Sequence, residues 1–185
     1  MDNIVEIIKN GGLVVMPTDT IYGIIGDATN VDTIRKVYEI KKRDFNKPLL
    51  MLVNSVDMLK KYVLNITDLE TELINEYWPG PLTIIFKKGI ELSDLLTAGK
   101  DTIGVRYPDN NMLLDIIGKV GRPLLSTSVN ISGKSEVTNP NFIDEEIINS
   151  IDFIMDCGVC DNVASSVIKC KDGKIIVLRK GEKFN

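Results

Sequence analysis

Short apolar runs alternate with segments of helical periodicity along most of this 185-residue chain. Residues 13–16 and 82–86 are continuous apolar runs of the kind that form buried strands, whereas residues 3–9 repeat apolar side chains at helical spacing. Near the C-terminus, strand candidates follow one another without a helix between them. This order predicts an α/β fold in which a twisted, open, mixed sheet carries flanking helices.

Turn and cap residues set the expected element boundaries. A capping box at residues 67–70 starts one helix, and the Pro-Gly-Pro turn at 79–81 stops it. Asp172-Gly173 predicts a hairpin turn, and residues 17–31 are interpreted as a turn-like stretch before a helix capped by Asp32. The expected strands are 13–16, 49–53, 82–86, 102–106, 124–127, 151–155, 166–170 and 174–179, and the other helices are 3–9, 32–42, 55–63, 110–118 and 143–149.

Composition restricts the class of protein. The chain shows no internal repeat and no linker composition, so residues 1–185 are expected to form a single domain. No secretory signal or membrane-spanning run is present in the sequence, and three cysteines are typical of a reducing compartment, which predicts a cytoplasmic protein without a membrane partner. Because the chain has no histidine, Ser-His-Asp hydrolysis, Cys-His proteolysis and His-ligated zinc are excluded.

A basic cluster follows the helix predicted at 32–42. It contains Lys41, Lys42, Arg43 and Lys47, although the chain as a whole has a net charge of −4. Cations at a helix C-terminus are stabilising by themselves, so a solvated helix end is an equally good interpretation. Alternatively, these side chains converge on a polyphosphate, because arginine can bind phosphate in a bidentate manner. We expect the cluster to bind a nucleoside triphosphate.

Polar residues follow two of the expected strands. Residues 18–23 leave the first strand, and residues 126–135 follow the strand at 124–127. α/β sheets place ligands at such strand ends, although an ordinary polar turn has the same composition. The Gly-Lys-Ser ending at 133–135 is not a P-loop, because the position that needs the first glycine is Ser128. Cys157 and Cys160 lack a second cysteine pair, so a structural role is favoured over a metal or redox site.

Seven segments together resemble the YrdC-type threonylcarbamoyl-AMP synthase family over nearly the whole chain. The resemblance to the short form of this family is carried by residues 17–23 (PTDTIYG), 41–49 (KKRDFNKPL), 78–83 (WPGPLT), 102–108 (TIGVRYP), 126–133 (STSVNISG), 165–167 (SSV) and 178–181 (LRKG).

The resemblance implies a YrdC-like fold with a concave basic site and a nucleotidyltransferase activity. L-Threonine, bicarbonate and ATP would give L-threonylcarbamoyladenylate and pyrophosphate, with Mg²⁺ accompanying ATP and no dedicated protein metal site. A separate transferase complex would then modify the tRNA adenosine next to the anticodon, and weak binding of tRNA by the chain itself is left open.

The resemblance also implies roles for individual residues. The catalytic signature corresponds to Lys41, Arg43, Ser128 and Asn130. The implied threonine contacts are Thr20, Arg106, Ser126 and Ser165, and the implied nucleotide contacts are Arg43, Lys47, Thr102, Ser128 and Arg179. Many family members carry histidines where this chain has Leu52 and either Asn110 or Asn111.

The residue inventory suits this reaction. A threonine carbamate attacks the α-phosphate without an enzyme nucleophile, so the protein has to align two anions and stabilise developing charge. Two alternatives remain at this level. One is a carbamoyl-phosphate-dependent domain like those of hydrogenase maturation proteins, and the other is a non-catalytic RNA-binding module. Net acidity and scarce aromatic residues argue against the second.

Overall fold

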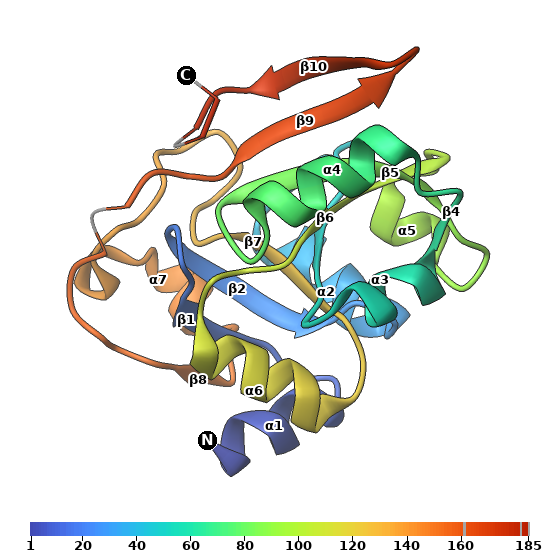
Figure 1. Ribbon diagram of the computed structural model, residues 1–185. Helices are drawn as coiled ribbons and strands as arrows, with labels where there is room; N and C mark the ends of the chain where they lie inside the picture. The colour runs from blue at the N-terminus through green and yellow to red at the C-terminus, as the bar shows by residue number, and fades with distance from the viewer. Residues whose placement is uncertain (161, 182, 185) are drawn as a thin grey trace.

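The computed structural model describes residues 1–160, 162–181 and 183–184. Its strands form one sheet in the order β10-β9-β5-β6-β3-β7-β2-β1-β8, and β4 pairs with β5 outside this path. The pairs β1/β8, β3/β6 and β5/β9 are parallel, and the other neighbours are antiparallel. The sheet is therefore mixed and open, which confirms the predicted fold class (Figure 1).

The strands are β1 (Val14–Pro17), β2 (Tyr22–Asp27), β3 (Leu50–Leu52), β4 (Val63–Leu64), β5 (Leu82–Lys88), β6 (Thr102–Arg106), β7 (Leu124–Ser128), β8 (Phe153–Ile154), β9 (Ser166–Lys171) and β10 (Lys174–Arg179). The helices are α1 (Asp2–Lys9), α2 (Val31–Ile40), α3 (Val56–Tyr62), α4 (Asp68–Tyr77), α5 (Asp94–Thr97), α6 (Asn111–Val120) and α7 (Glu145–Ile148), with a 3₁₀ turn at Pro140–Phe142.

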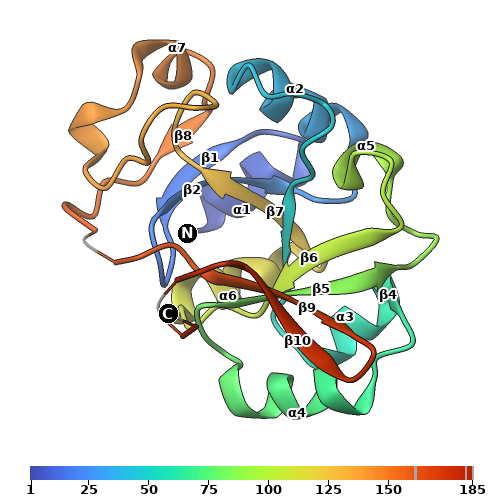
Figure 2. The same cartoon turned by 90° about the horizontal axis from the view of Figure 1, so that it is seen from above.

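Two apolar clusters cover the two faces of the sheet. The smaller cluster joins α1 and α6 to one face, and these helices lie side by side in Figure 1. The larger cluster packs α2, α3, α4, α5 and α7 against the other strand side chains. Figure 2 shows the β9–β10 hairpin on the same side of the molecule as α4, away from α2 and α7. Because α1 and α6 cover only part of their face, the rest of it is available for a site.

Most predicted elements are confirmed within a few residues of their expected ends. The capping box at Thr67 and Glu70 is present, with the Thr67 backbone N–H donating to the Glu70 carboxylate at 2.8 Å. The hairpin at 172–173 is also present, and both turn residues have positive φ. The cap of α2 was predicted wrongly. Asn30 rather than Asp32 accepts from the first-turn N–H groups, because the helix begins one residue before Asp32.

Strand β2 was missed because its two glycines and terminal aspartate suggest a turn. The glycines are needed for close packing. A Cβ on Gly26 would lie 2.6 Å from a methyl group of Thr33 and 2.7 Å from Leu13. A Cβ on Gly23 would lie 3.1 Å from the Ser126 hydroxyl. The strand is therefore a fully buried central strand with two glycines, and short-range patterns cannot separate it from a loop.

None of the helices in the described part of the chain is long and apolar enough to span a membrane.

Candidate functional site

A cavity of about 280 Å³ opens on the sheet face that α6 leaves uncovered. Strands β2, β3, β5, β6, β7, β9 and β10 contribute to its wall, together with the loops after β1 and α2. Glycines form part of its floor. At Gly104, an added Cβ would lie 3.2 Å from Ile85 and 3.3 Å from Thr83, both of which also line the cavity. Seven of the predicted site residues converge here, namely Thr20, Arg43, Arg106, Ser126, Ser128, Ser165 and Arg179.

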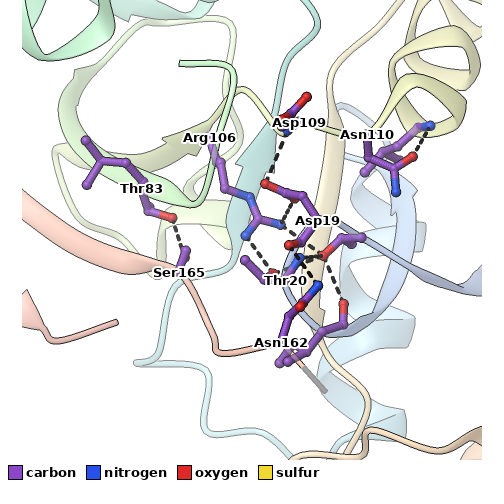
Figure 3. Close-up of polar contacts among 12 residues, drawn as sticks. Asp19, Thr20, Thr83, Arg106, Asp109, Asn110, Asn162 and Ser165 are labelled. Carbon is purple, nitrogen blue, oxygen red and sulfur yellow. Dashed lines mark hydrogen bonds and ion pairs between the residues drawn. The ribbon is translucent and has the colours of Figure 1, made fainter. Parts of the chain in front are cut away.

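One wall of the cavity is built around Arg106, which is only 3% exposed (Figure 3). Its Nη1 donates to the Thr20 hydroxyl at 2.8 Å, and its Nη2 donates to the Thr18 hydroxyl at 3.3 Å. The carboxylate of Asp19 lies 3.3 Å from Nη2 and accepts a hydrogen bond from the backbone N–H of Asp109 at 3.2 Å. The Nε of Arg106 and one Asp19 oxygen have no hydrogen-bond partner.

Both atoms are buried, and the Asp19 oxygen is the one that forms the ion pair with Nη2 of Arg106. Burial lowers the pKa of the Arg106 guanidinium, Asp19 raises this pKa again, and the nearby Arg179 lowers it further. The two cations therefore repel each other. A carboxylate between them would relieve that repulsion. This corner of the cavity is suited to an amino-acid carboxylate.

Beside Arg106, the wall carries hydroxyl groups and Arg179. The hydroxyls of Ser165 and Thr83 lie 2.9 Å apart (Figure 3). Arg179 donates from Nε to the Ser165 carbonyl at 3.0 Å and from Nη2 to the Ser165 hydroxyl at 3.1 Å. Ser165 thus holds the guanidinium of Arg179 at the cavity rim. Thr83 and Thr18 are lining residues that the sequence-based assignment did not include, although both lie within its motifs.

Lys41, in contrast, does not line the cavity and is only 1% exposed. Its ammonium donates to the Ser128 carbonyl, to the Asn130 carbonyl at 2.6 Å and to the Asn130 side-chain oxygen at 2.9 Å. The Ser128 hydroxyl donates to that same side-chain oxygen at 2.6 Å. Lys41 therefore fixes the turn after β7 and presents Ser128 to the cavity, while Asn130 serves as the link between them.

The pKa of Lys41 reflects this enclosed position. Burial lowers the pKa to about 7, the neighbouring Arg43 lowers it as well, and Glu136 raises it. An ammonium group has three donors, and three oxygen atoms accept them here. These contacts occupy Lys41 within the protein, and the assignment of Lys41 and Asn130 to catalysis stays a prediction.

The other cations of the basic cluster separate into different environments. Arg43 lines the cavity, and its guanidinium donates to the Lys47 carbonyl at 3.0 Å and to the Pro48 carbonyl at 2.8 Å. Burial lowers the pKa of Arg43. The side chain of Lys47 is exposed and does not line the cavity. Lys42 is also exposed and pairs with Glu146 at 2.5 Å, on the surface.

The remaining predicted contacts differ in whether they line the cavity. Ser126 is part of the wall, on the same face of β7 as Ser128. Thr102 begins β6 on the face that Gly104 and Arg106 share, but it lies beyond the lining residues. The assignment of Thr102 and Lys47 to the nucleotide stays a prediction.

Two positions that carry histidine in many family members have structural roles here. Leu52 is completely buried in the cluster beneath α1 and α6. The side chain of Asn110 caps α6 by accepting from the backbone N–H of Leu113 at 3.0 Å, and Asn111 is the first residue of that helix. None of these three side chains lines the cavity.

The cysteine loop packs against the segment that carries Thr20. The Tyr22 hydroxyl donates to the Gly158 carbonyl at 2.9 Å and accepts from the backbone N–H of Cys157 at 2.9 Å. The Cys160 thiol donates to the Thr20 carbonyl at 3.2 Å. Both cysteines are free thiols. Their loop supports the wall of the cavity from outside.

The described residues contain no group of three or more Cys, Asp or Glu side chains that could hold a metal ion. Glu136 contributes a carboxylate to the cavity wall.

Comparisons with known proteins agree with this architecture. A family model described as "Telomere recombination" (Sua5_yciO_yrdC) matches residues 6–181. A Methanocaldococcus jannaschii protein, provisionally named as a threonylcarbamoyl-AMP synthase, is 42% identical over 177 residues, which are 94% of this chain and 82% of that protein. The Bacillus subtilis protein named threonylcarbamoyl-AMP synthase is 32% identical over 177 residues, covering 95% of this chain and 51% of its own length.

Among solved structures, Pyrococcus abyssi Sua5 complexed with L-threonine superposes with a TM-score of 0.91 at 31% identity. The match covers 97% of this chain and 53% of that one. The chain thus spans about half the length of the Pyrococcus and Bacillus relatives.

Proposed function

The chain belongs to the Sua5/YciO/YrdC family, and we propose on this basis that it is a threonylcarbamoyl-AMP synthase. It forms L-threonylcarbamoyladenylate and pyrophosphate from L-threonine, bicarbonate and ATP, for modification of tRNA. A cytoplasmic location is part of the proposal. The observation that carries it is the convergence of seven residues, chosen from separate sequence segments, on one cavity.

Threonine is assigned to the Arg106 wall. The guanidinium would pair with the threonine carboxylate, while Thr20 and Ser126 face the polar groups of the amino acid. The Pyrococcus relative is described as a complex with L-threonine, and the two chains share 31% identity. The buried, protein-bonded setting of Arg106 would orient the substrate before reaction.

ATP is assigned to the rim formed by Arg43, Ser128 and Arg179. Two guanidinium groups and a hydroxyl can stabilise charge on the phosphates without a nucleophilic side chain. The carbamate formed from threonine and bicarbonate attacks the α-phosphate, the bond to the bridging oxygen breaks, and pyrophosphate leaves. Alignment of the carbamate with the α-phosphate is the main task of the protein.

Mg²⁺ is proposed to arrive with ATP, where it shields phosphate charge. The phosphates would supply most of its ligands, because the described residues offer no cluster for a metal. Glu136 is the carboxylate of the wall that could complete its coordination.

Mass spectrometry of the products from ATP, threonine and bicarbonate tests this function. We expect threonylcarbamoyladenylate and an equal amount of pyrophosphate, with much less product when serine replaces threonine. Product formation that requires carbamoyl phosphate instead of bicarbonate would assign the chain to carbamoyl transfer. Binding of tRNA without any nucleotide turnover would reject an enzymatic role.

A further inference from the structure

Strand β10 is the outer edge of the sheet, and β9 is its only neighbour among the described strands. All six of its residues are exposed, and four consecutive ones are aliphatic. Ile175, Ile176, Val177 and Leu178 are 39%, 42%, 42% and 58% exposed. An edge strand presents a row of unpaired backbone N–H and C=O groups on which another strand can pair. Apolar side chains beside that row mark an interaction surface.

This edge is continuous with the cavity. Arg179, the last residue of β10, lines the cavity, and so does Val167, its partner on β9. Ile176 is paired with Lys169, two residues along β9 from Val167, so that Ile176 faces the same side of the sheet. A strand added to β10 would therefore lie at the rim of the cavity.

Four lysines extend from the cavity toward this edge. On β9, Lys169 and Lys171 share the face of a lining residue, and Lys174 is the partner of Lys171 on β10. Lys87 lies two residues beyond a lining residue of β5. In the part of the chain that the structure describes, none of the four pairs with a carboxylate. An unpaired basic group on a protein of net charge −4 favours an acidic partner.

Other occupants fit this edge less well. Antiparallel pairing of β10 with β10 of a second copy, in full register, would place Lys174 opposite Arg179 of that copy, and like charges directly opposite are destabilising. Single-stranded RNA is usually bound by stacking on aromatic side chains, and the hairpin at 166–179 contains no aromatic residue. An extended acidic protein segment satisfies both the unpaired backbone and the lysines.

We propose that β10 is the docking strand for an acidic extended segment of the transferase that consumes the adenylate. The inference rests on the proposed function. Its product is a mixed anhydride of a carbamate and a phosphate, which water hydrolyses. A transferase bound at the rim receives this product before it reaches bulk solvent.

Photocrosslinking in a purified mixture tests the surface. The mixture contains this protein, the threonylcarbamoyl transferase complex of the same organism and its substrate tRNA. A benzoylphenylalanine replaces Ile176, and the matched control carries it at Ile90, which is 91% exposed outside the edge. We expect crosslinks to a transferase subunit from position 176 only, mapping to an acidic segment. Crosslinks to a second copy or to tRNA, or none at all, would overturn the proposal.

A charge-reversal variant gives an independent result. Lys169→Glu/Lys171→Glu/Lys174→Glu is compared with Lys9→Glu/Lys60→Glu/Lys61→Glu, which changes exposed lysines on α1 and α3. We expect both variants to release pyrophosphate at the wild-type rate. Transfer to tRNA at limiting synthase should fall about tenfold at low salt in the edge variant alone.

Equal transfer by both charge variants would contradict docking at β10. If the wild type releases no threonine-dependent pyrophosphate, the proposed function fails instead, so the two failures can be distinguished.

Discussion

Two buried cations of this protein, Lys41 and Arg106, differ in what their donors contact. The ammonium of Lys41 is directed at three oxygen atoms of the turn after β7. The guanidinium of Arg106 contacts Thr18, Asp19 and Thr20, and its buried Nε has no hydrogen-bond partner in the described part of the chain. The two residues are almost equally buried, because Lys41 is 1% exposed and Arg106 is 3% exposed. Position on the cavity wall, rather than burial, therefore separates Arg106, the proposed ligand contact, from Lys41.

The largest effect is expected for Arg106→Gln. Loss of a buried charge-assisted contact to the threonine carboxylate should raise the KM for threonine by about 100-fold or more, with a smaller change for ATP. Threonine-dependent exchange of pyrophosphate into ATP measures both constants. Arg106→Lys keeps the positive charge but not the bidentate geometry of the guanidinium, so it should recover part of the lost threonine affinity. A threonine KM within about threefold of wild type would remove Arg106 from the substrate site.

Lys41→Met should act mainly on stability. Three oxygen acceptors lose their donor, so the free energy of unfolding should fall by about 3 kcal/mol in urea titrations. Lys42→Met is the matched control, because Lys42 is exposed and pairs only on the surface. The free energy of unfolding of Lys42→Met should stay within about 0.5 kcal/mol of wild type. Similar values for the two variants would show that the contacts of Lys41 contribute little.

Arg43→Ala should lower the catalytic efficiency with ATP by about 10- to 100-fold, because it removes a cation from the cavity rim and two hydrogen bonds from the following loop. Arg35→Ala is the control, since Arg35 forms only an exposed pair with Asp32. Initial rates of pyrophosphate release at varied ATP provide the measurement. Equal rates for Arg43→Ala and the control would place the phosphates elsewhere.

The smallest expected effect is on how the free energy of unfolding depends on pH. The pKa of Lys41 is about 7 in the folded protein, whereas lysine in an unfolded chain has a pKa of about 10.4. Between these values the unfolded chain binds more protons, so the free energy of unfolding should rise with pH. Relative to Lys41→Met, wild type should gain about 2 kcal/mol between pH 7 and 9. Parallel pH dependences of the two proteins would mean that Lys41 keeps its proton.

Local signals in the sequence were sufficient for much of the fold. The capping box of α4 and the Asp172-Gly173 hairpin depend on residues within one turn, so their patterns predict them. Strand β2 was not predictable in this way. Its glycines are explained by contacts with Thr33, Leu13 and Ser126, which only the folded sheet brings near.

The candidate site shows the same division. The resemblance to the family assigned Arg106, Ser128 and Arg179 to the site, and the sheet brings them to one cavity. The orientation of Lys41 could not be predicted, because its acceptors are 87 and 89 residues away in the chain. Asp19 was also missed as a partner of Arg106, since a polar turn and a buried ion pair have the same local sequence.

Calorimetric titration with threonine most directly tests whether Arg106 binds the substrate while Lys41 stabilises the fold. Wild type, Arg106→Gln and Lys41→Met are titrated under one condition, after each has been shown to be folded. We expect Arg106→Gln to lose at least about 100-fold in threonine affinity, whereas Lys41→Met should stay within about threefold of wild type. Undiminished binding by Arg106→Gln, or a greater loss in Lys41→Met, would contradict this expectation.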